Sequence, residues 1–349
     1  DREKAAQEKI LRQTDKAQPA IGALSLAMLA VLERFGVHPQ AACGHSFGEL
    51  TALHAAGRLS AGDFLALSVA RGKAMAATAR PEGDTSQTSS GAMLAVKAPL
   101  AEIVDLLAEL DPALVLANRN SPEQGVISGA VDAIAAAERA CQKRGLQTRR
   151  LPVAAAFHSP LVQSAQVPFA QALAQVEMAE STVPVYANTT GRPYPADSAA
   201  ARALLGGQLV KPVDFVGAIE ALYRDGFQTF VEVGPKSVLT GLVKATLSQQ
   251  PFQAVALDPS AGTAFGLGDL AKTLSQLAAW GVAVDLTAWE EAPPASRKAV
   301  MTIPISGANL KPAPKAAIPP PPVTATPRTG VAAEPHSPAP RAIAAGMAP

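Results

Sequence analysis

The stretch Gly-His-Ser-Phe-Gly, at residues 44–48, places a serine between two glycines directly after an apolar run. The apolar residues predict a strand that ends near Cys43, and the following residues predict a helix over 48–57. A Gly-x-Ser-x-Gly sequence at such a junction is typical of a nucleophile elbow, a sharp turn in which only small residues fit beside a strained serine. The elbow would expose Ser46 at the amino-terminal end of the helix, where backbone N–H groups stabilise an oxyanion. The alternative is a glycine-bounded turn whose serine has no chemical role.

Strands and helices alternate on both sides of this turn. The chain has 349 residues, 48% of them hydrophobic, which is enough for a large buried core. Apolar spacing predicts helices over 3–13, 18–34, 62–79, 215–225 and 237–247, and strands over 183–187 and 229–233. Such alternation indicates an α/β fold with a mostly parallel sheet. We therefore expect a large α/β-hydrolase-like domain.

A different order of elements is predicted within residues 91–153. Strands are predicted over 91–97, 113–118, 125–128 and 148–153, and helices over 100–110 and 132–144. The order β-α-β-β-α-β is that of the ferredoxin-like fold. We expect a small ferredoxin-like subdomain inserted into the large domain, whose two segments are then 1–90 and 154–300.

The last part of the chain is rich in proline and alanine. Eleven of the 30 prolines lie within residues 311–349, four of them consecutive at 319–322. Such a composition forms no core, so residues 301–349 are predicted to be an extended, disordered linker. A linker in this position indicates a segment of a longer multidomain chain.

Composition excludes several classes of protein. The formal net charge of +1 gives no electrostatic reason to expect binding to nucleic acid or to an anionic membrane. The longest apolar stretch, residues 20–32, is too short and too interrupted to span a bilayer, and the charged N-terminal residues are unlike a signal peptide. The two cysteines, Cys43 and Cys141, fit a reducing compartment. We expect a cytoplasmic protein, and no cluster of residues predicts a metal site.

A serine nucleophile requires a base, and the chain has five histidines. His336 lies in the predicted linker and His38 in a loop, while His54 lies on a helix, where a packing or solvent role is expected. His45 adjoins the serine, so its side chain points away from the position of a base. His158, in Ala-Ala-Ala-Phe-His-Ser-Pro, follows the last strand of the subdomain. By elimination, we expect His158 to be the base.

Two motifs, Gly44-His45-Ser46-Phe47-Gly48-Glu49 and Ala156-Phe157-His158-Ser159, resemble those of the malonyl-CoA:acyl-carrier-protein transacylase family. This family includes the acyltransferase domains of polyketide and polyunsaturated fatty acid synthases. The sequences of the two motifs are most similar to the polyunsaturated fatty acid synthase type. The resemblance covers about residues 9–257. Further matching stretches are Ala56–Ser60, Arg71–Met75, Gln208–Val213 and Val231–Pro235.

The resemblance implies a mechanism. Ser46 attacks the thioester of malonyl-CoA, His158 takes its proton, and the backbone N–H of Phe47 donates to the oxyanion. The malonyl group then passes to the phosphopantetheine thiol of an acyl carrier protein. Phosphopantetheine belongs to that partner, so no bound cofactor is expected. In this family a backbone carbonyl, here that of Lys211, orients the histidine.

The resemblance also implies a selectivity for the acyl group. A free carboxylate requires a guanidinium partner in a partly desolvated pocket, and Arg71 matches the family's arginine. Phe157 matches the family's size filter, where a bulky ring accompanies malonyl. Gln18 and His45 would also line the substrate pocket. For Asn120 we expect a structural role in a turn.

Two departures from the family leave other functions open. Residues 1–20 contain no Gly-Gln-Gly-Ser-Gln stretch, which in the family carries the second oxyanion donor on the first strand. We therefore expect either a fragment that lacks a central strand and half of the oxyanion hole, or a preceding part that lies outside this sequence. Ala155 replaces a histidine of the malonyl signature. The alternatives are a serine hydrolase or thioesterase on a similar elbow, and a catalytically incomplete docking fragment. In a parent synthase, ketosynthase and carrier domains would be neighbours.

Overall fold

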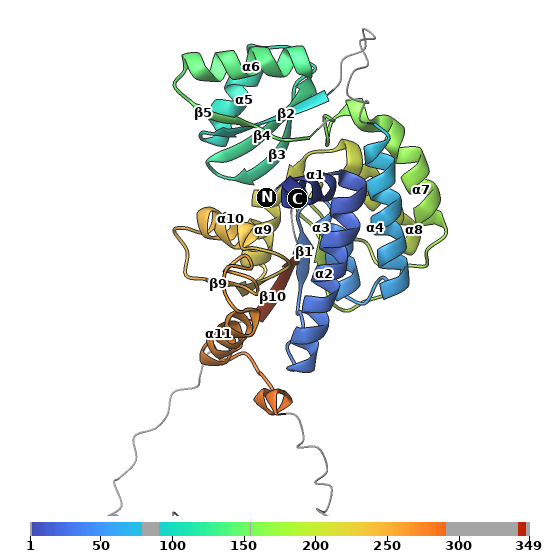
Figure 1. Ribbon diagram of the computed structural model, residues 1–349, viewed down its shortest axis with the longest axis vertical. Helices are drawn as coiled ribbons and strands as arrows, with labels where there is room; N and C mark the ends of the chain where they lie inside the picture. Colours follow the sequence, from blue (N-terminus) through green and yellow to red (C-terminus); the bar gives the residue numbers. More distant parts are fainter. Residues whose placement is uncertain (1, 79–90, 154, 291–340, 347–349) are drawn as a thin grey trace, which may run out of the picture. The chain divides into compact units, whose positions relative to one another are not determined.

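The computed structural model describes residues 2–78, 91–153, 155–290 and 341–346 (Figure 1). They belong to two units, one of residues 1–285 with 339–349 and the other of residues 286–338. In the second unit the described part is a short 3-10 helix, Leu286–Trp289, and the residue after it. All other helices and strands belong to the first unit.

A parallel sheet of five strands forms the centre of the first unit. Its strands are β6 (Val185–Tyr186), β1 (Ala42–Gly44), β10 (Arg341–Gly346), β8 (Phe227–Val233) and β9 (Gln253–Ala256), in that order. Each neighbouring pair is parallel. A parallel sheet of this kind is the predicted architecture of the large domain.

Helices cover both faces of this sheet. One core cluster contains residues of α3 (Gly48–Ala55), α4 (Ala61–Ala76), α7 (Gln166–Ala174) and α8 (Ser198–Gly207), and α2 (Thr14–Arg34) packs against it. A second contains residues of α9 (Phe215–Arg224) and α10 (Val238–Thr246). Successive strand residues point to opposite faces, so Ala42 and Val185 join the first cluster while Cys43 and Tyr186 join the second. The strand before the serine, β1, therefore contributes side chains to the cores on both faces of the sheet.

The inserted segment has its own sheet. Strands β2 (Gly91–Lys97), β3 (Val115–Ser121), β4 (Gln124–Ala130) and β5 (Gln147–Arg150) pair in the antiparallel order β5-β2-β4-β3. Helices α5 (Leu100–Ala108) and α6 (Val131–Lys143) pack on it. The predicted order β-α-β-β-α-β is present. A short strand that the sequence did not reveal, β7 (Val213–Asp214), pairs with β3 in parallel and ties this sheet to the large domain.

The strand β10 corrects two expectations. The prediction of a disordered linker is wrong for Arg341–Gly346, which pair with β1 on one side and with β8 on the other. We also expected the sheet to lack a central strand, whereas β10 lies centrally in it, between β1 and β8. The rest of the predicted linker lies outside the described residues.

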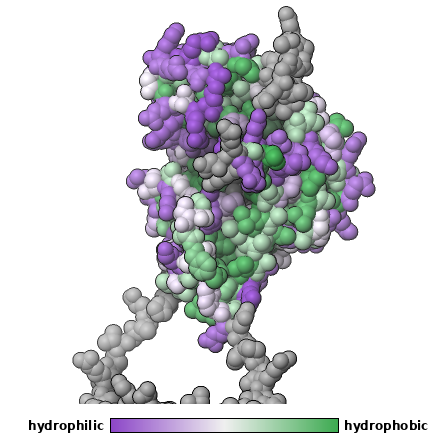
Figure 2. All heavy atoms as spheres, viewed as in Figure 1, coloured by the Kyte–Doolittle hydropathy of each residue, from purple (hydrophilic) through white to green (hydrophobic). Residues whose placement is uncertain are grey.

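Other elements lie at the periphery of the first unit. Helix α1 (Arg2–Leu11) precedes α2, and α11 (Gly266–Ala279) follows β9. Figure 2 shows hydrophilic residues over the inserted segment that carries α6, and more apolar residues in the lower centre of the view, where α2 lies. Leu24 and Val31 are exposed apolar residues of α2. Within the described ranges, no helix combines the length and the apolar character that a membrane crossing requires.

Candidate active site

The turn between β1 and α3 has the strained geometry of an elbow. Ser46 has a φ of 51°, in the left-handed region that side-chain-bearing residues rarely adopt. Such a conformation costs about 1–3 kcal/mol and persists only where its surroundings hold it. A Cβ on Gly44 would lie 1.9 Å from the carbonyl carbon of Gly48, so only glycine fits there. The first glycine of the motif thus allows the turn to close.

Ser46 and His158 form a hydrogen-bonded pair. The Ser46 Oγ lies 2.7 Å from the His158 Nε2, and both side chains are buried. The His158 Nδ1 lies 3.1 Å from the carbonyl oxygen of Lys211 and 3.2 Å from that of Gln208. Because carbonyls only accept, Nδ1 carries the proton and Nε2 accepts from the serine. The geometry is that of a neutral base with its lone pair on the hydroxyl.

Ser159 and the other histidines set aside in the sequence analysis do not take part in this pair. Ser159, next to the histidine, donates from Oγ to the carbonyl of Ala156 and is not the serine that the imidazole contacts. His54 stacks on Phe64 with 5.5 Å between ring centroids, a packing role as expected, while His38 is exposed. His336 lies outside the described residues.

Burial keeps the imidazole of His158 neutral. Burial, together with the nearby positive charge of Arg71, lowers the pKa of His158 to about 3. The unfolded chain takes up a proton near pH 6.5, so the contribution of neutral His158 to stability is complete above that pH and is lost as the pH falls towards 3.

Replacing His158 with glutamine should therefore flatten the decline in stability on acidification. Between pH 6 and pH 4 the wild-type chain should lose about 1 kcal/mol per pH unit more than His158→Gln does. Urea unfolding at several pH values measures this difference. The exposed His38→Gln serves as the matched control and should follow the wild type. Parallel curves for wild type and His158→Gln would contradict the role of burial.

Arg71, on α4, is a buried cation beside the serine. It is 1% exposed, and its Nη2 donates to the Ser46 Oγ at 3.1 Å and to the Gln208 Oε1 at 3.0 Å. Its Nη1 donates to the Gln18 Oε1 at 2.9 Å. Its Nε has no hydrogen-bond partner, and no carboxylate among the described residues forms an ion pair with it. Burial lowers the pKa of Arg71 to about 10, so it stays charged at neutral pH.

A buried guanidinium with a free N–H is suited to an anion. Buried charges in proteins are normally paired, and a buried donor without a partner is rare. The carboxamides of Gln18 and Gln208 hold the guanidinium but carry no charge. The free Nε–H belongs to the same guanidinium whose Nη2 contacts the serine, so an anionic substrate group could provide the missing partner.

His45 lies beside the elbow but does not bond the serine hydroxyl. Its Nε2 contacts the Asn120 Oδ1 at 2.7 Å, and its ring lies 5.6 Å from that of Phe215. The expectation of a turn at Asn120 is wrong, because β3 runs through Ser121 and holds the Asn120 amide against His45. A histidine in the motif was visible in the sequence, but its distant partner was not.

The two phenylalanines of the motifs differ in exposure. Phe47 is 3% exposed, and its ring packs against Phe64 at 6.4 Å between centroids. It immediately precedes α3, and its backbone N–H makes no hydrogen bond within the described ranges. Phe157 is half-buried and packs against core residues of both the large domain and the inserted segment. It therefore lies where the two parts meet.

Sequence reasoning missed four side chains that surround the serine. The Gln208 amide donates to the Ser46 carbonyl at 2.7 Å, and Asn188 accepts from the Ser46 N–H at 2.8 Å. Glu49 and Tyr194 bond each other behind Asn188. Glu49 and Gln208 lie inside motifs that carry the family resemblance, but Asn188 and Tyr194 had no signal in the sequence.

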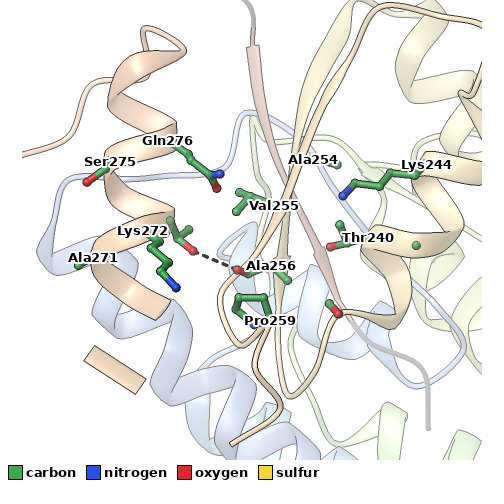
Figure 3. A pocket seen from close by; sticks show the side chains of 13 residues that line it. Thr240, Lys244, Ala254, Val255, Ala256, Pro259, Ala271, Lys272, Ser275 and Gln276 are labelled. Atoms are coloured by element: carbon green, nitrogen blue, oxygen red, sulfur yellow. Dashed lines mark hydrogen bonds between the residues drawn. The ribbon is translucent and has the colours of Figure 1, made fainter. Parts of the chain in front are cut away.

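A separate cavity lies at the edge of the parallel sheet. It has a volume of about 750 Å³ and is bounded by α10, β9 and α11 (Figure 3). Lys244 and Lys272 line it from the two helices, and the Thr273 hydroxyl donates to the Ala256 carbonyl there. It contains none of the residues around Ser46. The described residues also include no group of three His, Cys, Asp or Glu side chains that could hold a metal ion.

Comparison with known proteins supports one family. Residues 4–270 match the acyl transferase domain family. A phenolphthiocerol synthesis polyketide synthase of Mycobacterium marinum is 36% identical over 79% of this chain and 12% of its own length. A polyunsaturated fatty acid synthase component of Thraustochytrium is 32% identical over 75% of this chain and 9% of its own length. The chain thus spans about a tenth of these relatives.

Solved structures give the same result. The acyltransferase domain from the second module of the salinomycin polyketide synthase has a TM-score of 0.71 and 32% identity, covering 80% of this chain and 63% of that one. A malonyl CoA-acyl carrier protein transacylase from Clostridium perfringens has a TM-score of 0.70 and 31% identity, covering 78% of this chain and 82% of that one. The fold is therefore shared over most of both chains.

Proposed function

The chain belongs to the acyl transferase domain family, and from this premise we propose that it transfers malonyl from malonyl-CoA to an acyl carrier protein through an ester on Ser46. The observation that carries the proposal is the contact of the Ser46 Oγ with both the neutral His158 Nε2, at 2.7 Å, and the charged Arg71 Nη2, at 3.1 Å. A base and an anion-binding group meet at one hydroxyl.

The first half of the reaction forms the acyl-enzyme. As the Ser46 Oγ attacks the thioester carbonyl, its proton passes to the Nε2 of His158, which already accepts it in a hydrogen bond. The free N–H of Phe47, before the start of α3, is placed to donate to the oxyanion that develops. Collapse breaks the carbon–sulfur bond, and the CoA thiolate leaves with the proton from His158.

The second half reverses these steps on a different thiol. The phosphopantetheine thiol of the carrier protein gives its proton to His158 and attacks the malonyl ester. The carbon–oxygen bond breaks, and the Ser46 Oγ recovers the proton. The carbonyls of Lys211 and Gln208 hold the Nδ1–H throughout, so Nε2 alone exchanges protons. The phosphopantetheine group enters with the partner, so the chain itself supplies only the serine, the base and the donors.

A serine hydrolase remains the second candidate function, because water in place of the carrier thiol would release free malonate. The buried site favours transfer, since Ser46, His158 and Arg71 are each less than 10% exposed. Incubation with radiolabelled malonyl-CoA and an acyl carrier protein tests the proposal. Label on the carrier supports transfer, whereas label released as malonate at the same rate with and without the carrier would contradict it.

Phe157 is proposed to limit the size of the acyl group. It precedes the base, and its ring is only partly buried and packs against core residues of both the large domain and the inserted segment. Removing the ring in Phe157→Ser should admit a methyl branch and raise the ratio of methylmalonyl to malonyl transfer about tenfold, which is the selectivity expected for one methyl group. Competition between the two CoA esters, read as intact protein mass, measures the ratio. An unchanged ratio in a folded variant would refute the filter.

The wider setting of the chain is also a proposal. Its relatives include polyketide synthases and a component of a polyunsaturated fatty acid synthase, and the sequences of the serine and histidine motifs favour the second type. We infer that the chain works beside ketosynthase and carrier domains of such a synthase. A cytoplasmic location, with neither nucleic acid nor a membrane as partner, stays a prediction.

A further inference from the structure

The backbone of Ser46 is held on both sides by side-chain amides. Its N–H donates to the Asn188 Oδ1 at 2.8 Å, and its carbonyl accepts from the Gln208 Nε2 at 2.7 Å. The Asn188 Nδ2 also donates to the carbonyl of Gly44 at 2.6 Å. Because a backbone N–H only donates and a carbonyl only accepts, these partners determine which end of each amide is the oxygen. Asn188 therefore bridges Gly44 and Ser46 across the turn.

Glu49, in the first turn of α3, holds Asn188 in place. The Glu49 carboxylate accepts from the backbone N–H of Asn188 and from the hydroxyl of Tyr194. Glu49 and Asn188 are both completely buried. A buried carboxylate is costly unless donors satisfy it, so this arrangement is a built one and not a solvated surface contact.

We propose that Asn188 and Glu49 are positioning residues that hold the Ser46 turn in its left-handed conformation and so aim the nucleophile. Neither side chain bonds the Ser46 hydroxyl, His158 or Arg71, so each acts through the backbone of Ser46. The positive φ of Ser46 persists only where neighbouring groups stabilise it. The hydrogen bonds of the Asn188 side chain with Gly44 and Ser46 provide that stabilisation. The inference rests on the proposed function, since it takes Ser46 as the nucleophile.

A different role for Glu49 makes a different prediction. Burial raises the pKa of Glu49 to about 7, and the charge of Arg71, which makes no ion pair with Glu49 but lies in the same buried region, opposes that rise. If Glu49 served only as the counter-charge of Arg71, its loss would alter reactions that use a substrate carboxylate and spare those that do not. If it positions the turn, all reactions of the Ser46 hydroxyl should slow together. A serine-directed fluorophosphonate, which carries no carboxylate, separates these two cases.

The experiment measures the rate of Ser46 acylation by malonyl-CoA and of its labelling by a fluorophosphonate, per folded molecule of the full chain. Asn188→Asp keeps the shape of the side chain but has no donor for the Gly44 carbonyl. We expect about a 100-fold fall in both rates, the loss that follows a small misplacement of a reacting group, with an unchanged KM for malonyl-CoA. Glu49→Gln keeps one acceptor oxygen for the Asn188 N–H and should lose about tenfold in both rates.

Glu232→Gln is the matched control. Glu232 is also a buried glutamate that accepts from backbone N–H groups, those of Leu239 and Thr240 at the start of α10, and the hydrogen bonds described for its carboxylate all go to α10 and not to the serine turn. Its replacement should lower the melting temperature and leave both rates unchanged. Loss of rate in Glu232→Gln equal to that in Glu49→Gln would show a general effect of lost stability and overturn the inference.

Further outcomes keep the two proposals distinguishable. Wild-type rates in a folded Asn188→Asp chain would overturn the positioning role. If Asn188→Asp does not fold, Tyr194→Phe decides, because it removes one donor to Glu49 and keeps the ring; a several-fold fall in both rates supports the role and no fall overturns it. A wild-type chain that is labelled by the fluorophosphonate but not acylated by malonyl-CoA would contradict the proposed function, while the labelling rates of the variants would still test the positioning role.

Discussion

Replacing Ser46 with alanine should abolish the malonyl adduct that brief incubation with malonyl-CoA forms on the wild-type chain. The Ser46 Oγ is the atom that both the His158 Nε2 and the Arg71 Nη2 contact, so no other hydroxyl in the described part of the chain has the same base and the same anion-binding group. Loss of a nucleophile that works with a base typically lowers the rate by about 10⁴-fold or more. Intact-protein mass spectrometry should therefore show the malonyl increment in the wild type and none in Ser46→Ala.

Ser68→Ala is the control for the loss of a buried hydroxyl. Ser68 lies on α4, is fully buried and donates to the carbonyl of Phe64, without contact to His158. It should keep the adduct. A malonyl increment that persists in Ser46→Ala would remove the serine from the mechanism. A wild-type chain that is folded by circular dichroism and forms no adduct would contradict the proposed activity.

Much of the fold was predictable from local pattern. Three features depend only on neighbours in the sequence: the apolar run before Gly44, the helix after it and the new order of elements that begins at residue 91. The structure has a helix or strand at each of them. The strand β10 was not predictable. A proline- and alanine-rich tail carries no alternating pattern, and its six strand residues pair with β1 and β8, which lie far away in the chain. Pairing over such a distance leaves no local signal.

The same limit applies to the site. Ser46 followed from the spacing of two glycines, and His158 followed from elimination among five histidines. The role of Asn188 could not be inferred, because a lone asparagine after a two-residue strand looks like any turn residue. Its function becomes visible only when β6 pairs beside β1 and brings its amide against the Ser46 N–H. Contacts that arise from sheet pairing can be identified only from the tertiary structure, whereas residues within one motif can be identified from the sequence.

Arg71 separates substrates that carry a carboxylate from those that do not. Its Nε has no partner among the described residues, and its Nη2 already points at the Ser46 Oγ, so a malonyl carboxylate beside the serine would complete the guanidinium. Hydrogen bonds to charged groups contribute about 1.5–3 kcal/mol each, so losing two costs at least about 3 kcal/mol, or about 100-fold. Arg71→Ala should therefore lower acylation by malonyl-CoA about 100-fold more than acylation by acetyl-CoA.

The ratio of the two rates is the informative quantity, because Arg71 also contacts the serine and its loss slows every substrate to some extent. Arg58→Ala is the matched control, since Arg58 is a buried arginine whose guanidinium donates to the carbonyls of Pro195 and Ala196 and not to Ser46. It should lower stability and leave the ratio unchanged. Arg71→Lys should recover only part of the ratio, because a lysine restores the charge without the planar pair of donors that a carboxylate prefers. Equal losses for malonyl-CoA and acetyl-CoA in Arg71→Ala would mean that the guanidinium serves the serine alone, and the selectivity for a carboxylate would then have to come from elsewhere.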